Sequence, residues 1–205
     1  MEIAELFNKG GAIMYLLLAI SVAVAAIGIE RLNFYNYAAG NGDKFLDSLE
    51  NNLENQDLNA VANFCHNEKN LASEVAFAGI FAALNKKNIE LALETAYSEA
   101  AMKLRARLNY LSMFVTLSPL LGLLGTIFGM IDAFNIFNLQ AGQPMTITGG
   151  IGAALIATAT GLCVAIFALI VHTYFAQKLD EILTELEKTE NIILANLKGK
   201  ENETP

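Results

Sequence analysis

The chain has 205 residues, of which 54% are hydrophobic and only 17% are charged, and its mean hydropathy is +0.41. This composition is unusual for a soluble domain and indicates an integral membrane protein. The formal net charge of -8 argues against a nucleic-acid partner, and no basic cluster points to phosphate or lipid-headgroup recognition.

Three long segments contain no Asp, Glu, Lys or Arg: residues 10–29, 108–131 and 133–177. About 20 apolar residues cross the hydrocarbon core, so the first two segments each predict one span. The third is interrupted by polar residues between Asn135 and Pro144, which leaves one more span after the break. We therefore predict an external N-terminus (1–10), spans at 11–30, 109–135 and 148–174, a cytoplasmic helical region (31–108), an external loop (136–147) and a cytoplasmic C-terminal helix and tail (175–205).

The uncharged segment from Val75 to Leu84 is too short to cross a bilayer, so we expect a buried soluble helix there. The N-terminus carries Glu2, Glu5 and Lys9 rather than a basic patch, so the first span is expected to remain as an anchor. Almost all Lys and Arg residues lie between spans one and two or after span three, and none lies between spans two and three. Basic residues in short flanks stay in the cytoplasm, which places the N-terminus outside and the C-terminus inside.

The soluble segments are expected to be helical, because strand signals are few and the chain has only three prolines. A stripe with helical spacing runs from Ile89 through Leu93 to Leu104 and meets no breaker before span two. A second stripe, from Leu179 to Leu197, follows span three. We predict an all-α membrane protein in which spans two and three continue far into the cytoplasm as a helical bundle.

Small residues dominate the outer parts of spans two and three. In span three, ten of the thirteen residues from Gly149 to Gly161 are Gly, Ala or Thr. Such faces let two helices approach closely. The residues expected to pack helices together or to face a partner are Gly122, Gly125, Gly129, Gly150, Ala154, Ala157 and Gly161.

The polar side chains within the spans are uncharged. By default, the hydroxyl of a Ser or Thr in a membrane helix bonds a carbonyl of its own helix. Pro119 frees one backbone carbonyl in span two, and the hydroxyl of Ser118 or Thr116 is expected to bond it. Asp132 and His172 lie near span ends, and an ion could enter or leave there. Proton transport needs a titratable group within the membrane, so a partner must supply the carboxylate if a cation crosses here.

Two segments, Ser118–Gly129 and Gly150–Leu162, resemble the signature segments of the MotA/TolQ/ExbB family. The resemblance extends to the order of the three spans and to the large insertion between spans one and two. Three spans make the chain more similar to ExbB and TolQ than to MotA, which has four.

The resemblance implies a homopentamer in the bacterial inner membrane around two single-span partners of the ExbD, TolR or MotB type. The partner's membrane Asp would carry protons or sodium ions. By position, Thr126 and Thr158 match the family's pore-facing threonines, and Pro119 matches its span-two proline. The resemblance implies that these three residues and Ala153 line the ion pathway. Ala153 departs from the family pattern, because ExbB and TolQ usually have Glu there.

The resemblance thus implies a motor subunit that couples an ion gradient to work by its partner on envelope transport or maintenance. A non-conducting scaffold or assembly protein is the alternative. An intramembrane enzyme would need a nucleophile with a base, or paired aspartates, within the spans; Asp132, Cys163 and His172 lie at scattered depths and do not supply them. We expect no cofactor beyond the transported ion, and no disulfide between Cys65 and Cys163.

Overall fold

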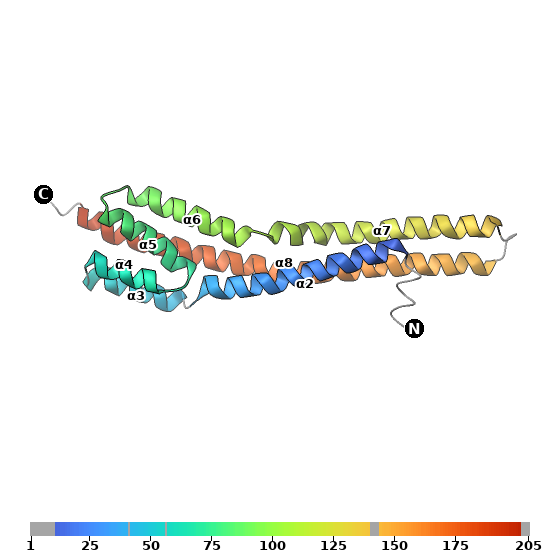
Figure 1. Cartoon of the computed structure of the whole chain (residues 1–205), viewed down its shortest axis with the longest axis horizontal. Coiled ribbons are helices and arrows are strands. Elements are labelled where there is room, and N and C mark those ends of the chain that lie inside the picture. Colours follow the sequence, from blue (N-terminus) through green and yellow to red (C-terminus); the bar gives the residue numbers. More distant parts are fainter. Residues whose placement is uncertain (1–10, 41, 56, 140–143, 202–205) are drawn as a thin grey trace. The chain divides into compact units, whose positions relative to one another are not determined.

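The computed structural model describes residues 11–40, 42–55, 57–139 and 144–201, and all regular structure within these ranges is α-helical. Three helices are long and apolar enough to cross a membrane. They are α2 (Ala12–Ala39), α7 (Leu108–Leu139) and α8 (Pro144–Glu201), shown in Figure 1. The expectation of an all-α membrane protein with three spans is confirmed.

The chain divides into two compact units, which are described separately. The first unit, called here the membrane unit, comprises residues 1–29 and 107–174. The second, called the bundle unit, comprises residues 30–106 and 175–205. Helices α2 and α8 each contribute to both units.

In the membrane unit, the first part of α2 buries one face and exposes the rest. Its buried side chains are those of Met14, Leu17, Ile20 and Val24, which recur at helical spacing. Large apolar side chains remain exposed around the unit, among them Val22, Leu120 and Ile170, each more than 60% exposed. Apolar surface of this extent is typical of a protein surrounded by lipid or by other subunits.

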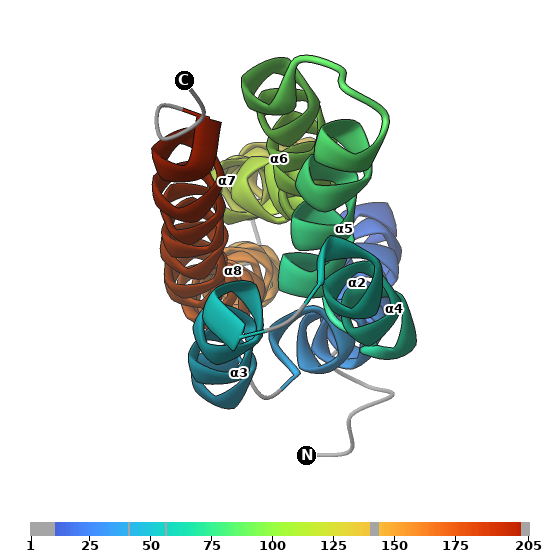
Figure 2. The ribbon, with the colours of Figure 1, turned by 90° about the vertical axis from the view of Figure 1, so that its left-hand side faces the viewer.

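The bundle unit contains four short helices and the second part of α8. The helices are α3 (Gly42–Asn55), α4 (Leu58–Asn67), α5 (Leu71–Leu84) and α6 (Ile89–Arg105). Figure 2 shows α5 lying between α4 and α6, and it packs against both. Val75, Ala76 and Ile80 of α5 are at most 1% exposed, so the short apolar segment is indeed a buried helix.

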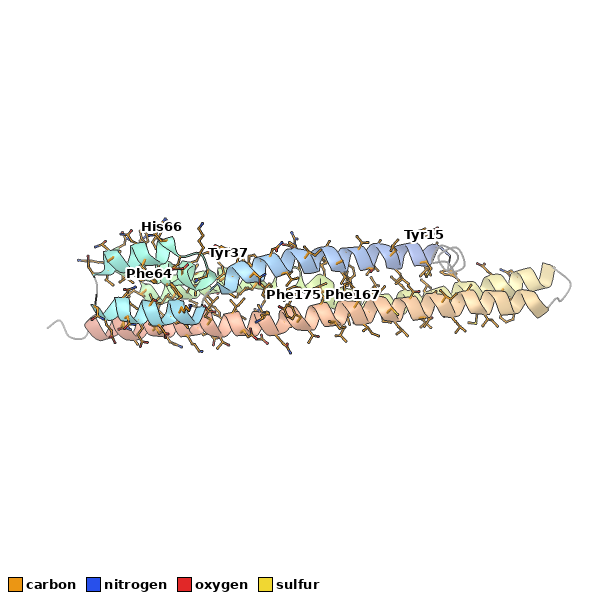
Figure 3. All side chains as sticks on the ribbon, turned by 90° about the horizontal axis from the view of Figure 1, so that it is seen from below. Tyr15, Tyr37, Phe64, His66, Phe167 and Phe175 are labelled. Carbon is orange, nitrogen blue, oxygen red and sulfur yellow. The ribbon has the colours of Figure 1, made fainter. Side chains whose placement is uncertain are left out.

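The two predicted apolar stripes form part of the core of this unit. Leu93 and Leu104 of α6 are fully buried, as are Ile182, Leu186 and Ile193 of α8. Aromatic side chains add to the packing: Phe64 of α4 stacks on Phe45, whereas His66 of the same helix is exposed and lies against Phe77 (Figure 3). The helical period of the sequence therefore identified the buried faces correctly.

The end of α6 is held by two side chains of α2. The buried Tyr35 hydroxyl donates a hydrogen bond of 2.9 Å to the Leu104 carbonyl, and the Arg31 guanidinium donates one of 3.0 Å to the Lys103 carbonyl. Carbonyls in the last turn of a helix have no intrahelical partner, and a cation there also interacts favourably with the helix dipole. Tyr35 also packs on Phe175 of α8, with ring centroids 5.3 Å apart.

The expected uninterrupted helix from the cytoplasm into span two is not present. Helix α6 ends at Arg105 and α7 begins at Leu108. Between them, Ala106 is extended and Arg107 has a φ of 67°, in the left-handed region. The prediction was wrong because neither residue is a helix breaker by type, so the sequence contains no Gly or Pro to mark the interruption.

Helices α7 and α8 also extend further than the expected spans. Helix α7 runs to Leu139 and α8 begins at Pro144, so the connection between them is shorter than the external loop predicted at 136–147. Pro144 stands at the first position of α8, where its fixed φ suits a helix and its missing N–H removes no intrahelical bond.

Candidate functional site: the α7–α8 seam

Helices α7 and α8 run antiparallel in the membrane unit and touch through their backbones (Figure 1). A Cβ atom added at Gly161 would lie 2.6 Å from the Ser118 carbonyl oxygen and 2.9 Å from the Gly122 Cα. One added at Gly122 would lie 3.0 Å from the Ala157 carbonyl oxygen. Only glycine fits this approach, which is the close packing that small residues permit in membrane helices.

The contact continues along both helices in the direction of Ala133 and Gly150. A Cβ added at Gly125 would lie 2.6 Å from the Ala157 Cβ, and one at Gly129 would lie 3.0 Å from the Ala154 Cβ. One added at Gly150 would overlap Ala133. The row of contacts is called here the seam: Ser118, Gly122, Gly125, Gly129 and Ala133 of α7 with Gly161, Ala157, Ala154 and Gly150 of α8. All seven small residues singled out in the sequence lie in it.

One hydroxyl crosses the seam. The Thr158 Oγ1 atom donates a hydrogen bond of 3.1 Å to the Gly122 carbonyl. The other hydroxyls bond within their own helices: Thr126 to the Leu123 carbonyl at 2.6 Å, and Thr160 to the Ile156 carbonyl at 2.8 Å. Thr126 and Thr158 are both half-buried.

The hydroxyl groups next to Pro119 do not bond the carbonyl that this proline frees. Pro119 leaves the Val115 carbonyl without its usual i+4 donor. The Ser118 hydroxyl instead donates to the Phe114 carbonyl at 2.7 Å, and that of Thr116 to the Met113 carbonyl at 2.9 Å. The expected pairing was wrong, because each hydroxyl reaches the carbonyl three or four residues before its own residue.

Thr126 and Thr158 lie on the same side of the helix pair. Each follows directly after one member of a contacting pair, Gly125 and Ala157. In antiparallel helices, equal steps from a contacting pair turn to the same side. By the same geometry Phe128 and Ala153, each one residue before a member of the contacting pair Gly129 and Ala154, lie on the opposite side.

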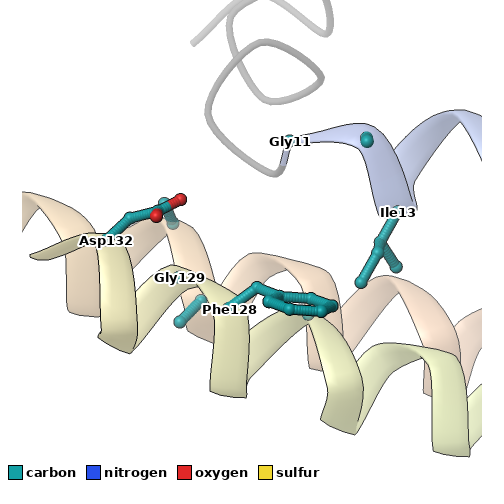
Figure 4. A pocket seen from close by; sticks show the side chains of 9 residues that line it. Gly11, Ile13, Phe128, Gly129 and Asp132 are labelled. Carbon is teal, nitrogen blue, oxygen red and sulfur yellow. The ribbon is translucent and has the colours of Figure 1, made fainter.

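That opposite side holds a pocket of about 310 Å³, shown in Figure 4. Its walls are the start of α2 at residues 11–13, Gly125, Phe128, Gly129 and Asp132 of α7, and Ala153 and Ala154 of α8. Asp132 is exposed and Ala153 is half-buried. The structure thus brings Asp132 and Ala153 together but separates both from the face that carries Thr126 and Thr158.

His172 and Pro119 lie apart from these groups. His172 is half-buried and is fourteen residues beyond Thr158 on α8, which is about 21 Å along a helix. Pro119 lies within α7 beside Ser118 of the seam and is half-buried. Within the described part of the chain, no group of three or more His, Cys, Asp or Glu side chains could hold a metal ion.

Sequence reasoning missed the pocket and the bond across the seam. Both depend on the register between helices that are distant in sequence. The start of α2 in particular carries no chemical signal, since its wall of the pocket is made of Gly11, Ala12 and Ile13.

Comparison with known proteins identifies the family. Residues 67–188 match the model of the MotA/TolQ/ExbB proton channel family, and this range includes the whole seam. The chain belongs to this family. The family and the three apolar helices together indicate a multi-pass protein of the inner membrane.

Several curated relatives agree with this membership. The chain is 33% identical to the putative biopolymer transport protein ExbB-like 1 of Synechocystis sp., over 80% of this chain and 67% of the relative. It is 31% identical to the ExbB-like 3 protein of the same organism, over 81% of both chains. The chain is also 34% identical to the Tol-Pal system protein TolQ of Pseudomonas aeruginosa, over 47% of this chain and 42% of the relative.

Proposed function

We propose that this protein is the ion-pathway subunit of a motor that couples the proton or sodium motive force to work by a single-span partner of the ExbD or TolR type. The partner's work would energise envelope transport or maintenance. The similarity to a putative biopolymer transport protein and to a Tol-Pal system protein supports this part of the proposal. The observation that carries the proposal is the placement of Thr126 and Thr158 on one side of the seam.

The chemistry of the spans supports a partner-supplied carboxylate. Asp132 is the single acidic residue among the described residues of the membrane unit, and it lies at the end of the uncharged run in α7, on the side away from the threonines. Titratable groups within the membrane are costly and functional by default, and no Asp, Glu, Lys or Arg occurs among the described residues of 108–131 or 144–177, which include Thr126 and Thr158. A partner helix with a membrane Asp would complete the pathway against this face.

The hydroxyls of Thr126 and Thr158 bond carbonyls through their hydrogens, so their oxygen lone pairs remain as acceptors. Such acceptors can bind a proton-carrying water, a sodium ion or the protonated carboxyl of the partner. Pro119 would lie along the same pathway. Ala153, although matched by position to a family Glu, lies with Asp132 on the opposite side of the seam, so neither would line this pathway. His172 would act near its cytoplasmic end.

We propose further that five copies surround two partner helices, with the N-terminus outside and the C-terminus in the cytoplasm. The seam joins α7 and α8 tightly within one copy, so the pair can move as one wall of a ring. The exposed apolar residues of the unit, such as Leu120 and Ile170, then face lipid or neighbouring copies.

The test is ion flux and assembly measured on the complex coexpressed with its genomic neighbour. Thr126→Val and Thr158→Val should lower ion flux into proteoliposomes at least tenfold while the complex still purifies intact. Thr160→Val is the matched control. The Thr160 hydroxyl bonds a carbonyl of its own helix, and Thr160 directly precedes the seam residue Gly161, which places it on the side of the seam opposite Thr126 and Thr158. Ion flux at the wild-type level in both Thr126→Val and Thr158→Val would contradict the proposal.

A non-conducting scaffold is the second candidate, and Ala153 is the feature that favours it, because no acidic side chain stands at this position. Native mass spectrometry separates the two. A pentamer carrying two single-span partners, together with ion flux, supports the motor. A stable assembly that conducts no ion under a proton or a sodium gradient supports the scaffold.

A further inference from the structure

The pocket on the far side of the seam is a built cavity rather than a part of the proposed pathway. Its volume of about 310 Å³ lies at the lower end of the range for small-molecule sites. Ile13 and Phe128 give it apolar walls, and the Asp132 carboxylate is its single charged group (Figure 4). Apolar walls with one well-placed polar group are typical of a ligand site.

The depth of Asp132 in the membrane indicates which class of ligand can reach the pocket. The uncharged run before it, residues 108–131, is 24 residues long. A helix of that length rises about 36 Å, slightly more than the hydrocarbon core, so Asp132 lies at the level of the lipid headgroups. The ligands present there at high concentration are phospholipids.

The negative charge of Asp132 indicates the charge of the ligand's headgroup. No hydrogen bond or ion pair joins the Asp132 carboxylate to another described residue. The basic side chains among the described residues of the membrane unit lie far from it: Arg107 is 25 residues away at the other end of α7, about 37 Å along the helix, and His172 is 19 residues beyond the pocket residue Ala153 on α8, about 28 Å. An exposed carboxylate at headgroup level without a basic neighbour attracts a cationic group.

We propose that this pocket binds a phospholipid with a primary amine headgroup, such as phosphatidylethanolamine, whose ammonium group donates hydrogen bonds to Asp132. The glycerol and the start of one acyl chain then occupy the apolar part of the pocket between Ile13 and Phe128. This recognition works through a carboxylate, so it needs no basic cluster. It is independent of the proposed function, because the pocket and the threonine face lie on opposite sides of the seam.

The experiment is native mass spectrometry of the purified full-length protein after exchange into mixed micelles of three lipids. These are dioleoyl phosphatidylethanolamine, phosphatidylcholine and phosphatidylglycerol. The quaternary ammonium of phosphatidylcholine cannot donate a hydrogen bond, so a direct bond to the carboxylate predicts about tenfold preferential retention of phosphatidylethanolamine. Equal retention of these two lipids would overturn the proposal.

Three variants locate the site. Asp132→Asn should abolish the preference for phosphatidylethanolamine, and Ala153→Leu should fill the pocket and lower its retention. Ala159→Leu is the control, because Ala159 is exposed on α8 and does not line the pocket. Wild-type preference in Asp132→Asn, or equal loss in both leucine variants, would overturn the proposal.

Lys9 lies outside the described residues but close to Gly11 in the sequence, so an ion pair with Asp132 must be distinguished from lipid binding. Such a pair predicts that Lys9→Ala and Asp132→Asn lower the unfolding temperature in a non-additive way, with no lipid preference in the wild type. That result would overturn the lipid proposal. Undiminished lipid preference in Lys9→Ala would support it. Thr126→Val and Thr158→Val should keep the preference whether or not they conduct ions.

Discussion

The Thr158 hydroxyl donates a hydrogen bond of 3.1 Å to the Gly122 carbonyl across the antiparallel pair of α7 and α8. A Cβ atom at Gly122 would lie 3.1 Å from the Thr158 Cα, so the bond and the close approach of the two backbones occur at the same point. Thr158 therefore has a packing role beside any role in ion transfer, and experiments must separate the two.

We expect Thr158→Ser to keep the bond and Thr158→Val to lose it. The valine variant should be about 1 kcal/mol less stable, since hydrogen bonds between membrane helices contribute about 0.6–2 kcal/mol. Unfolding of the detergent-solubilised protein measures this difference. A valine variant as stable as the wild type would show that the hydrogen bond contributes nothing to packing. A serine variant that is stable but conducts no ions would show that the threonine methyl group is needed for ion flux.

Gly161→Ala should destabilise the membrane unit, because the new methyl group would lie 2.6 Å from the Ser118 carbonyl oxygen. We expect a loss of about 1–3 kcal/mol, as for other overpacked sites. Gly152→Ala is the matched control on the same helix, because a Cβ there meets nothing within 4 Å. Thermal unfolding in detergent compares the two variants, and equal unfolding temperatures would contradict the tight seam.

Gly42→Ala should disturb the contact between α3 and α8. The position of a Cβ at Gly42, the first residue of α3, is occupied by the Glu185 carboxylate of α8. An acidic group at a helix N-terminus stabilises the helix by about 0.3–1 kcal/mol, so displacing it should cost a similar amount. A double-mutant cycle with Glu185→Ala checks the cause: the glycine substitution should cost less once the carboxylate is absent, and strict additivity would argue against the contact.

Tyr35→Phe should destabilise the bundle unit by about 1–3 kcal/mol, because the buried Leu104 carbonyl would lose its donor. Tyr37→Phe is the control on the same helix. Its hydroxyl bonds the Glu74 carboxylate at the exposed surface, where a lost bond is replaced by water. Chemical denaturation followed by circular dichroism should rank the two variants in this order.

Cys65 should react slowly with alkylating reagents in the folded protein. Burial is the main cause that raises the pKa of its thiol from 9.0 to about 12, and the Glu68 carboxylate adds to the rise. In a Cys163→Ser background, iodoacetamide at pH 8 should modify Cys65 far more slowly in the folded than in the denatured protein. Because the folded state favours the neutral thiol, this residue contributes stability below pH 9.0 that is lost as the pH rises toward about 12. Rapid alkylation of the folded protein at pH 8 would contradict this.

The sequence by itself determined the class of this protein and most of its helices. Three uncharged runs fixed the number of spans, because the thickness of the hydrocarbon core sets a minimum length that Val75–Leu84 does not reach. The period of the stripes ending at Leu104 and Leu197 marked buried faces, since helix geometry is local. Small residues at helical spacing indicated which faces of spans two and three could pack closely.

Only the tertiary structure decided which groups meet. It paired Gly122 with Thr158, placed Asp132 beside Ala153 in a pocket walled by the start of α2, and used Tyr35 to hold the end of α6. It also interrupted the helix at Arg107 without a Gly or Pro. These relationships depend on the register and rotation of helices that are far apart in sequence, and the spacing of residues along one helix carries no information about either.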